Sequence, residues 1–401
     1  MGKTLAEVVQ QLSTGKVVKK TVSEMTKEVE EVKPVPKIQL IYAFNGTGKT
    51  RLSREFKKLV PPNNHHNNEA SRLDLYRKAI LYYSAFTEDL FYWDNDLEDN
   101  VEHKLKIQPN SFTDWVLKDQ GQDMNVITNF QRYTSDKLTP RFNEEKKDEK
   151  TGKIIKKAFS EVTFSLQRGD ETHSGNLKLS KGEESNFIWS IFYTLLEQVI
   201  FVLNISDPNA RENTDFNDLQ YVFIDDPVSS LDENHLIQLA VDLASLIKSS
   251  QSDLKFIIST HSPLFYNVLF NELNNKTCYM LERFEDGSFA LTEKYGDSNQ
   301  SFTYHLHLKQ TIEKAITENR VERFHFSMLR NLYEKTASFL GYSKWSELLP
   351  DDKQLYLSRI LNFTSHSTLS NEAVAEPTPA EKAMVKFLLN HLTKNHNFGR
   401  K

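Results

Sequence analysis

The sequence predicts an α/β sheet domain followed by a mostly helical C-terminal domain. Three observations support this fold class. An apolar run at residues 38–43 leads through a glycine-rich turn, residues 44–50, into a helix-compatible segment. A second apolar run ends in the adjacent acids Asp225 and Asp226. In residues 311–340, by contrast, apolar side chains recur at helical spacing.

The order of the expected elements follows from these patterns. Residues 1–37 are rich in Lys and Glu and predict a small helical lead-in and then a linker. Residues 95–158 predict a polar helical insertion, whose end at 141–157 is a solvated hairpin or a flexible loop. We expect a first domain at 1–264 and a second at 265–401. Apart from the strand that ends near residue 260, the expected strands are residues 38–43, 79–86, 162–166, 221–225, 278–281 and 289–292.

The composition indicates a soluble protein. Hydrophobic residues make up 38% of the chain, enough for real cores, and the net charge of −5 argues against a generally basic coat while leaving room for a local basic cleft. Cys278 is the only cysteine, which fits a reducing cytoplasm. The longest apolar stretch, 187–205, contains Glu197 and Asn204 and therefore predicts a buried helix rather than a membrane span. The N-terminus has no apolar signal core, so we expect a cytoplasmic protein without a membrane partner.

The glycine-rich turn predicts a phosphate-binding loop. Gly46 and Gly48 allow the backbone to turn sharply and to bring its N–H groups, with Asn45 in the same turn, against phosphate oxygens. The N-terminus of the following helix adds a partial positive charge. Lys49 is expected to reach the β- and γ-phosphates of a nucleotide, and Thr50 to offer its hydroxyl to Mg²⁺.

The two adjacent acids complete this predicted nucleotide site. Asp225, at the end of an apolar strand, is expected to hold Mg²⁺ directly or through water. Asp226 follows it and is placed to orient or deprotonate the attacking water. The alternative is that the acid pair caps a helix at the end of a loop, which is the weaker interpretation beside a phosphate-binding loop.

These motifs, in this order, resemble the ABC-type ATPases, including the RecF- and SMC-like members. The resemblance implies a signature motif at 179–184, a D-loop at 229–232 and a switch histidine at His261. Taken alone, His261 could also be an ordinary histidine at a strand end. The nucleotide contacts implied by the resemblance, beyond the phosphate-binding loop, are Ser180, Lys181, Gly182, Glu183, Asp226, Asp232 and His261.

Three residues depart from the pattern of that family. Ala43 stands where the loop motif usually begins with Gly, and Lys181 replaces a Gly of the signature motif. Asp226 is shorter than the usual Glu, which predicts slow hydrolysis or a rearrangement before hydrolysis. In this family the signature motif contacts the nucleotide of another subunit, so the resemblance implies a homo-oligomer, a dimer or higher.

The C-terminal region carries a second set of chemically useful residues. Arg330 and Glu334 lie four apart on a predicted helix, and His366 follows in a Ser/Thr-rich segment. A histidine can move a proton near neutral pH, a carboxylate can take the complementary proton, and a guanidinium can hold the charge of a phosphorane. This set suits RNA cleavage without a metal. By spacing alone, a surface ion pair and a polar loop histidine remain the stronger interpretation.

The whole chain also resembles the PrrC family of bacterial anticodon nucleases. The resemblance rests on residues 42–53, 85–96, 179–187 and 223–232 and on the C-terminal region. In that family an Arg-x-x-x-Glu…His set cleaves RNA, and the matching residues here are Arg330, Glu334 and His366. The anticodon-recognising peptide of the family resembles residues 294–301, which implies a base contact by Asp297; Ser298 and Asn299 are weaker candidates that could simply form a turn.

The resemblance further implies a substrate, partners and cofactors. The substrate is lysine tRNA, cut 5′ to the wobble base to leave a 2′,3′-cyclic phosphate and a 5′-hydroxyl. A type I restriction-modification complex holds the nuclease silent until a phage attacks that complex. ATP or GTP with Mg²⁺, and dTTP, act at the ATPase domain, whereas RNA cleavage needs no metal. An anticodon loop is a reasonable physical target, because proteins usually read RNA bases in splayed single strands.

Two other functions are compatible with the motifs. A RecF/SMC-like DNA-repair ATPase would use the C-terminal region to dock a partner, but such proteins usually carry a long coiled coil or a basic surface. The insertion at 95–158 is short and of mixed charge, which argues against that function. An ATPase of a defence system whose C-terminal region recruits another effector is the third hypothesis.

Overall fold

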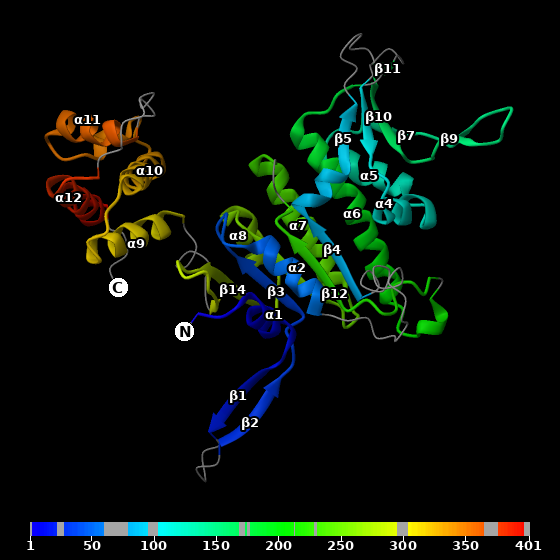
Figure 1. The fold of residues 1–401 in the computed structure, drawn as a ribbon, viewed down its shortest axis with the longest axis horizontal. Coiled ribbons are helices and arrows are strands. Elements are labelled where there is room, and N and C mark those ends of the chain that lie inside the picture. Colours follow the sequence, from blue (N-terminus) through cyan, green and yellow to red (C-terminus); the bar gives the residue numbers. More distant parts are fainter. Residues whose placement is uncertain are drawn as a thin grey trace. The chain divides into compact units, whose positions relative to one another are not determined.

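The protein consists of two compact units, Met1–Tyr295 and Gly296–Lys401, here called the N-terminal and the C-terminal unit (Figure 1). In the described residues the first combines sheets with helices and the second is helical. Both parts of the predicted fold class are therefore confirmed. The computed structural model describes residues 2–21, 28–59, 79–94, 103–167, 173–174, 177–211, 213–227, 231–294, 304–364 and 376–396.

A six-stranded sheet forms the centre of the N-terminal unit (Figure 1). Its strands lie in the order β15-β14-β3-β13-β12-β4, and all neighbours are parallel except the antiparallel pair β14 and β15. Strands β3 and β12 are buried along their whole length, as expected for parallel strands covered on both faces. The six strands are β3 (Ile38–Tyr42), β4 (Ile80–Ser84), β12 (Tyr221–Asp225), β13 (Lys255–Thr260), β14 (Lys276–Arg283) and β15 (Phe289–Lys294).

The predicted domain boundary after residue 264 is too early. Strand β14 pairs in parallel with β3, and β15 pairs with β14, so this hairpin completes the central sheet of the N-terminal unit. The two compact units separate only after Tyr295. The hairpin was readable from the turn between its two apolar runs, but its pairing with β3 is a long-range contact that no local pattern records.

Helices cover both faces of the central sheet. On one face, helices α1 (Leu5–Ser13) and α2 (Lys49–Leu59) pack on Ile41, Phe223 and Ile257. Helix α6 (Lys181–Leu203) lies on the other face, where Trp189 meets the ring of Tyr83 edge-on at 5.2 Å. Successive side chains of a strand point to opposite faces of its sheet. Tyr82, the residue before Tyr83 in β4, therefore faces the side of α2, where its hydroxyl contacts Ser53 at 2.9 Å. Helices α7 (Glu233–Ser249) and α8 (Pro263–Glu272) pack against each other, and α8 also contacts β3 and β13.

Helix α6 is long and apolar enough to cross a membrane by length and composition, but it is a core helix. In its most apolar window 83% of the residues are buried. Beyond the central sheet, Phe187 meets Phe130 of helix α5 and Phe164 of strand β10 at ring distances of 5.6 and 5.2 Å. The prediction of a buried helix at 187–205 is thus confirmed, and α6 joins the central sheet to a second layer of the unit.

That second layer is an antiparallel sheet with its own short helices. Strand β10 pairs with β6, β7 and β11, and β6 pairs with β5. The elements are 3-10 helix η1 (Ala85–Leu90), β5 (Phe91–Asp94), β6 (Lys104–Ile107), α4 (Ser111–Asp114), the π-helical segment η2 (Trp115–Asp119), α5 (Asp123–Tyr133), β7 (Leu138–Phe142), β10 (Glu161–Gln167) and β11 (His173–Ser174). The 3-10 helix η3 (Pro208–Ala210) lies between α6 and β12 in the chain.

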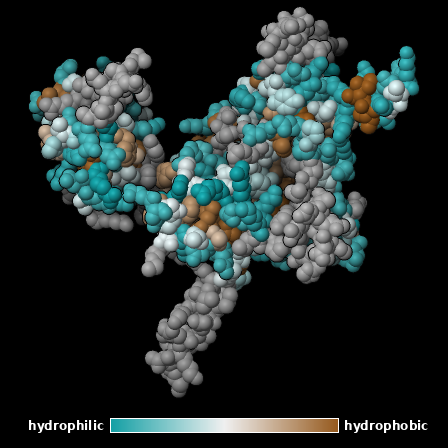
Figure 2. All heavy atoms as spheres, viewed as in Figure 1, coloured by the Kyte–Doolittle hydropathy of each residue, from teal (hydrophilic) through white to brown (hydrophobic). Residues whose placement is uncertain are grey.

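Two predicted segments differ in character from the structure. Residues 103–158 contain strands as well as helices, so the insertion is not simply helical. Its end forms the expected hairpin, β8 (Lys146–Lys147) and β9 (Ile154–Lys156), and Figure 2 shows a hydrophobic patch there, where Ile154 and Ile155 are exposed. Within 1–37 the helical lead-in is confirmed, but an antiparallel hairpin of β1 (Lys16–Thr21) and β2 (Glu28–Lys33) occupies the expected linker. Each strand contains two Val residues, a β-branched type that favours strands.

The C-terminal unit has a core of its own. Its helices are α9 (Tyr304–Thr317), α10 (Arg323–Leu340), η5 (Trp345–Leu348), α11 (Lys353–Thr364) and α12 (Pro379–Asn395). Buried apolar side chains from all five form one cluster, with Tyr333 of α10 and Leu388 of α12 near its centre. The single helix expected at 311–340 is instead two helices, broken where Asn319 takes a left-handed φ of 55°.

Candidate functional site

The glycine-rich turn lies where β3 leads into α2. Gly46 and Gly48 have φ angles of 79° and 108°, which side chains other than glycine rarely adopt. A Cβ atom on Gly48 would lie 3.3 Å from the ring of Phe289 in β15. The turn therefore needs glycine at Gly48 both for its backbone and for its packing against the central sheet.

Lys49 begins α2 with its ammonium group turned back over the loop. The Nζ atom lies 3.2 Å from the carbonyl oxygen of Ala43, 3.4 Å from Oδ1 of Asn45 and 3.4 Å from Oδ2 of Asp226. The side chain is only 7% exposed. Since this buried charge is satisfied by oxygens alone, a phosphate group could take the place of one of them.

Asp225 ends β12 directly beside the start of α2. Its carboxylate accepts a hydrogen bond of 2.7 Å from Ser259 of β13 and another from Thr50. Burial raises the pKa of this carboxyl, and the two hydroxyl hydrogen bonds partly offset that effect. A carboxylate and a hydroxyl in contact are the hard oxygen donors that Mg²⁺ prefers, so Asp225 and Thr50 fit the predicted metal site.

Asp226 connects the glycine-rich loop to His261. Its Oδ2 atom lies 2.6 Å from Nδ1 of His261 and 3.4 Å from the ammonium of Lys49. Burial opposes ionisation of Asp226, but the hydrogen bond from His261 and the charge of Lys49 outweigh it and lower its pKa. The structure thus brings together Lys49, Thr50, Asp225, Asp226 and His261 around one loop.

The residues of the signature segment begin helix α6. The Ser180 hydroxyl accepts a hydrogen bond from the Glu183 N–H at 3.3 Å, and the Glu183 carboxylate accepts one from the Ser180 N–H at 2.8 Å. This reciprocal cap satisfies two donors of the helix start. Lys181 forms an ion pair of 2.9 Å with Glu184 while its side chain stays 78% exposed. Glu184 is also held by the indole N–H of Trp93 at 2.9 Å.

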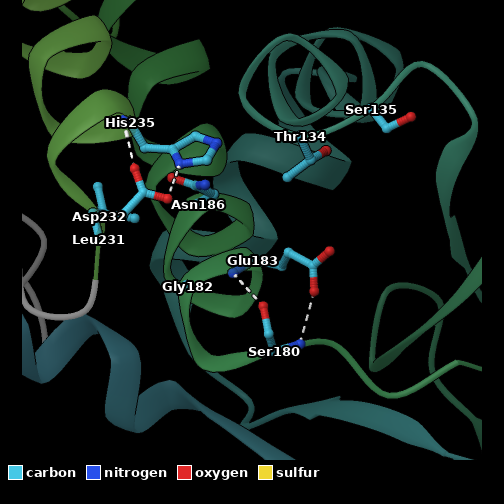
Figure 3. A pocket seen from close by; sticks show the side chains of 9 residues that line it. All are labelled: Thr134, Ser135, Ser180, Gly182, Glu183, Asn186, Leu231, Asp232 and His235. Atoms are coloured by element: carbon cyan, nitrogen blue, oxygen red, sulfur yellow. Dashed lines mark hydrogen bonds and ion pairs between the residues drawn. The ribbon is translucent and has the colours of Figure 1, made fainter.

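A pocket of about 400 Å³ joins the signature segment to the start of α7 (Figure 3). Asp232 caps α7, and its carboxylate accepts from the His235 N–H at 3.0 Å and lies 2.7 Å from the His235 ring. The backbone hydrogen bond from His235 comes first among the causes that lower the Asp232 pKa. The pocket is lined by Thr134, Ser135, Ser180, Gly182, Glu183, Asn186, Leu231, Asp232 and His235, a set that includes no residue of the glycine-rich loop.

Arg330 and Glu334 lie one turn apart on α10, as predicted. The Arg330 Nε atom donates to Oε1 of Glu334 at 2.8 Å, and both side chains are about one-third exposed, at 34% and 39%. The guanidinium also lies over the ring of Trp345, 5.9 Å from its centre. His366 and the predicted recognition residues Asp297, Ser298 and Asn299 lie outside the described residues.

Sequence reasoning missed several side chains that build these sites. Ser259 and Thr260 hold the two acids, Ser259 through Asp225 and Thr260 through a 3.3 Å contact with Asp226. The sequence did contain a signal for these two residues, because both directly precede His261 at a predicted strand end. In the structure, Asp225 and Ser259 are partners in the pairing of β12 with β13. His235 had no comparable signal, since a histidine in the first turn of a helix is common.

Comparison with known proteins gives two independent matches. Residues 152–388 match the AAA domain family, a stretch that begins after the glycine-rich loop. An anticodon nuclease of Escherichia coli is 69% identical over 404 residues, which cover 99% of this chain and 98% of that protein.

Solved structures resemble the chain more remotely. The cbiO1 component of an ABC transporter from Clostridium perfringens is 11% identical over 75% of this chain and 93% of its own, with a TM-score of 0.34. An Smc head domain from Pyrococcus furiosus, bound to a part of ScpA, is 13% identical over 44% of this chain and 35% of its own, with a TM-score of 0.27.

Proposed function

We propose that this chain, which belongs to the anticodon nuclease family, is a nucleotide-gated endoribonuclease that cuts lysine tRNA 5′ to the wobble base in defence against phage. The observation that carries the proposal is the 69% identity with an anticodon nuclease along 99% of the chain. The Arg330–Glu334 pair supports it, because the two side chains that the chemistry requires are in contact and accessible.

Cleavage would proceed by attack of the ribose 2′-oxygen on the adjacent phosphorus. The 2′-oxygen loses its proton to one of Glu334 and His366, and the other supplies a proton to the leaving 5′-oxygen. A P–O bond to the 2′-oxygen forms as the bond to the 5′-oxygen breaks, which gives a 2′,3′-cyclic phosphate and a 5′-hydroxyl. The Arg330 guanidinium would hold the extra negative charge of the phosphorane. This step requires no metal ion.

The N-terminal unit would bind and hydrolyse ATP or GTP, and bind dTTP, and thereby control cleavage. Thr50 and Asp225 would hold Mg²⁺, which supplies neutralisation of phosphate charge. Lys49 would exchange its contact with Asp226 for a phosphate oxygen, which frees the Asp226 carboxylate to orient the attacking water. The pocket of Ser180 and Asp232 would face the nucleotide of a second copy of the chain, so we propose a dimer or higher oligomer.

The cellular setting belongs to the same proposal. We infer a cytoplasmic protein that a type I restriction-modification complex holds inactive. Residues 294–301, with Asp297 foremost and Ser298 and Asn299 beside it, would contact the anticodon.

The experiment is to incubate the purified chain with total bacterial tRNA, without added metal, and to map the new ends. A single cut in the anticodon loop of lysine tRNA, absent with the His366→Ala variant, is the expected result. Cuts scattered over many tRNAs, or the same cut by His366→Ala, would contradict the proposal.

A further inference from the structure

Helix α12 of the C-terminal unit carries three lysines on the side that is not packed into the core. Lys382, Lys386 and Lys394 recur at intervals of four and eight residues, which places them on one side of the helix. The opposite side, with Val385 and Leu388, is buried in the core. The only carboxylate of the helix, on Glu381, caps the helix start and bonds the Thr378 N–H at 2.7 Å.

The lysines of this face have no anionic partner among the described residues. Elsewhere in the unit a lysine on a helix does pair, as Lys309 does with Glu313 at 3.0 Å. The contrast matters because two ammonium groups one turn apart repel each other when no carboxylate lies between them. This repulsion destabilises the helix by about a few tenths of a kcal/mol. A ligand with closely spaced negative charges would relieve that repulsion.

Two of these lysines border a pocket of about 340 Å³. Lys382 and Lys386 contribute to its wall, while α9 and the loop that follows it contribute Ile316 and Val321. No acidic side chain is among the residues that line it, which are Ile316, Asn319, Val321, Pro377, Pro379, Lys382, Ala383 and Lys386. The pocket wall therefore combines two cations with apolar side chains and contains no acid.

We propose that this face of α12, defined by Lys382, Lys386 and Lys394, binds the phosphate backbone of the RNA substrate. Four residues of helix rise about 6 Å, a spacing on the scale of successive phosphates in one strand. Phe387 favours RNA over an acidic protein surface, because its ring, which stacks on Tyr356 at 5.8 Å and lies 6.4 Å from the His391 ring, is still 49% exposed next to Lys386 in the helix. Lysines interleaved with an exposed aromatic ring are the pattern by which proteins hold RNA without reading its sequence.

This inference rests on the proposed function and deepens it, because it adds contacts with the RNA backbone to the base contacts proposed for residues 294–301. Backbone contacts fix where the RNA lies and carry no sequence information. The face would hold the tRNA while Arg330 and Glu334 act on one phosphodiester.

The test uses the full chain, made inactive by His366→Ala, and a lysine tRNA transcript. The dissociation constant is measured from low to moderate salt for three proteins. The first is the inactive His366→Ala chain, the second also carries Lys382→Gln/Lys386→Gln, and the third carries Lys314→Gln/Lys353→Gln instead, as the matched control. The control removes the same charge from exposed lysines of α9 and α11 in the same unit. Loss of two phosphate contacts should reduce the magnitude of the slope of log association constant against log salt by about two. We expect this change in Lys382→Gln/Lys386→Gln and not in the control.

Each outcome decides between the possibilities. A weaker affinity and a smaller slope for Lys382→Gln/Lys386→Gln, with an unchanged control, support the contact. Equal affinities and slopes in the two double variants overturn the RNA contact. An acidic protein would then be the better candidate for binding this face of α12. If the starting protein does not bind the tRNA at all, the proposed function itself fails. Thermal unfolding of each variant shows that it is folded.

Discussion

Asp226 adopts a left-handed backbone conformation, with a φ of 54°, immediately after strand β12. For a residue with a side chain this conformation costs about 1–3 kcal/mol, although Asp tolerates it better than most. Its N–H donates to the Ser259 carbonyl at 2.8 Å, and its carboxylate is bound by His261. These bonds hold the carboxylate beside Lys49, where we propose that a nucleotide phosphate is hydrolysed.

Replacing Asp226 by Asn tests this geometry. The amide keeps the shape but loses the negative charge, so it can neither pair with Lys49 nor take a proton. We expect nucleotide hydrolysis to fall by about 10²-fold or more, while nucleotide binding persists. Phosphate release and equilibrium binding of a labelled nucleotide measure the two effects, with Asp215→Asn on the surface as a control. Unchanged hydrolysis would remove Asp226 from the mechanism.

His325 is a second residue whose protonation state the fold determines. The residue is 4% exposed, and its Nδ1 accepts a hydrogen bond of 2.9 Å from the Glu322 N–H at the start of α10. Burial lowers the pKa of His325. A histidine with a lowered pKa in the folded state binds its proton more readily when unfolded, so its contribution to stability is present above pH 6.5 or so and is lost as pH falls.

We therefore predict that acid weakens the helix α10 through His325. Backbone amides of α10 should lose hydrogen-exchange protection between pH 7.5 and 5.5, after correction for intrinsic exchange rates. His325→Gln, which cannot ionise, should lose less protection over the same interval. His396→Gln, at the end of α12, is the control and should behave like the unaltered chain. Equal losses in all three proteins would show that another group senses the pH.

At the scale of elements, strand β15 packs against the glycine-rich loop through Phe289. Its residue Phe289 is 4% exposed and lies against the loop at Gly48. The loop thus depends on a hairpin that follows it by more than two hundred residues in the sequence. This hairpin also ends at Lys294, where the segment that we propose for anticodon recognition begins.

Replacing Gly48 by Ala should distort the loop. The new Cβ would meet the Phe289 ring at 3.3 Å, and the φ of 108° is strained for any side chain. A strain of about 1–3 kcal/mol at this position corresponds to a loss of nucleotide affinity of about 5- to 150-fold. Gly152→Ala is the matched control, since Gly152 has a φ of 64° but its Cβ would meet nothing within 4 Å. Equal affinities of the two variants would contradict the proposed packing.

Much of the N-terminal unit could be predicted because its elements carry local signals. The buried strands β3 and β12 are continuous apolar runs, and the glycines and Lys49 between β3 and α2 follow a known phosphate-binding pattern. Contacts between distant segments could not be predicted in this way. The pairing of β14 with β3 and the contact of Phe289 with Gly48 depend on register and packing, which no window of sequence contains.

In the candidate sites, too, local contacts could be predicted and long-range contacts could not. Arg330 and Glu334 were predicted to meet because helical spacing alone brings them together, and the structure shows the contact. Thr134 and His235 come from helices far apart in the sequence, and only the fold places them around one pocket with Ser180. The break between α9 and α10 was missed because the apolar spacing continues across it.

At the scale of the whole molecule, the two proposed activities reside in units with separate cores. The N-terminal core gathers residues between Val8 and Leu291, and the C-terminal core gathers residues between Leu308 and Leu392. A substitution at an accessible site in one unit should therefore leave the packing of the other unit intact. The two activities should be separable by mutation even though one is proposed to control the other.

Reciprocal variants test that separation. Glu334→Gln removes the carboxylate that we propose exchanges protons with the RNA, so tRNA cleavage should fall by about 10²-fold or more while nucleotide hydrolysis stays within about twofold. Lys49→Ala should abolish the response of cleavage to added nucleotide but leave Arg330 and Glu334 in contact. Because Glu334 is accessible and, among the residues that the structure describes, pairs with Arg330 across one helical turn, its loss should not unfold α10. Parallel loss of both activities in Glu334→Gln would mean that a single site serves both, and the division of labour between the two units would be wrong.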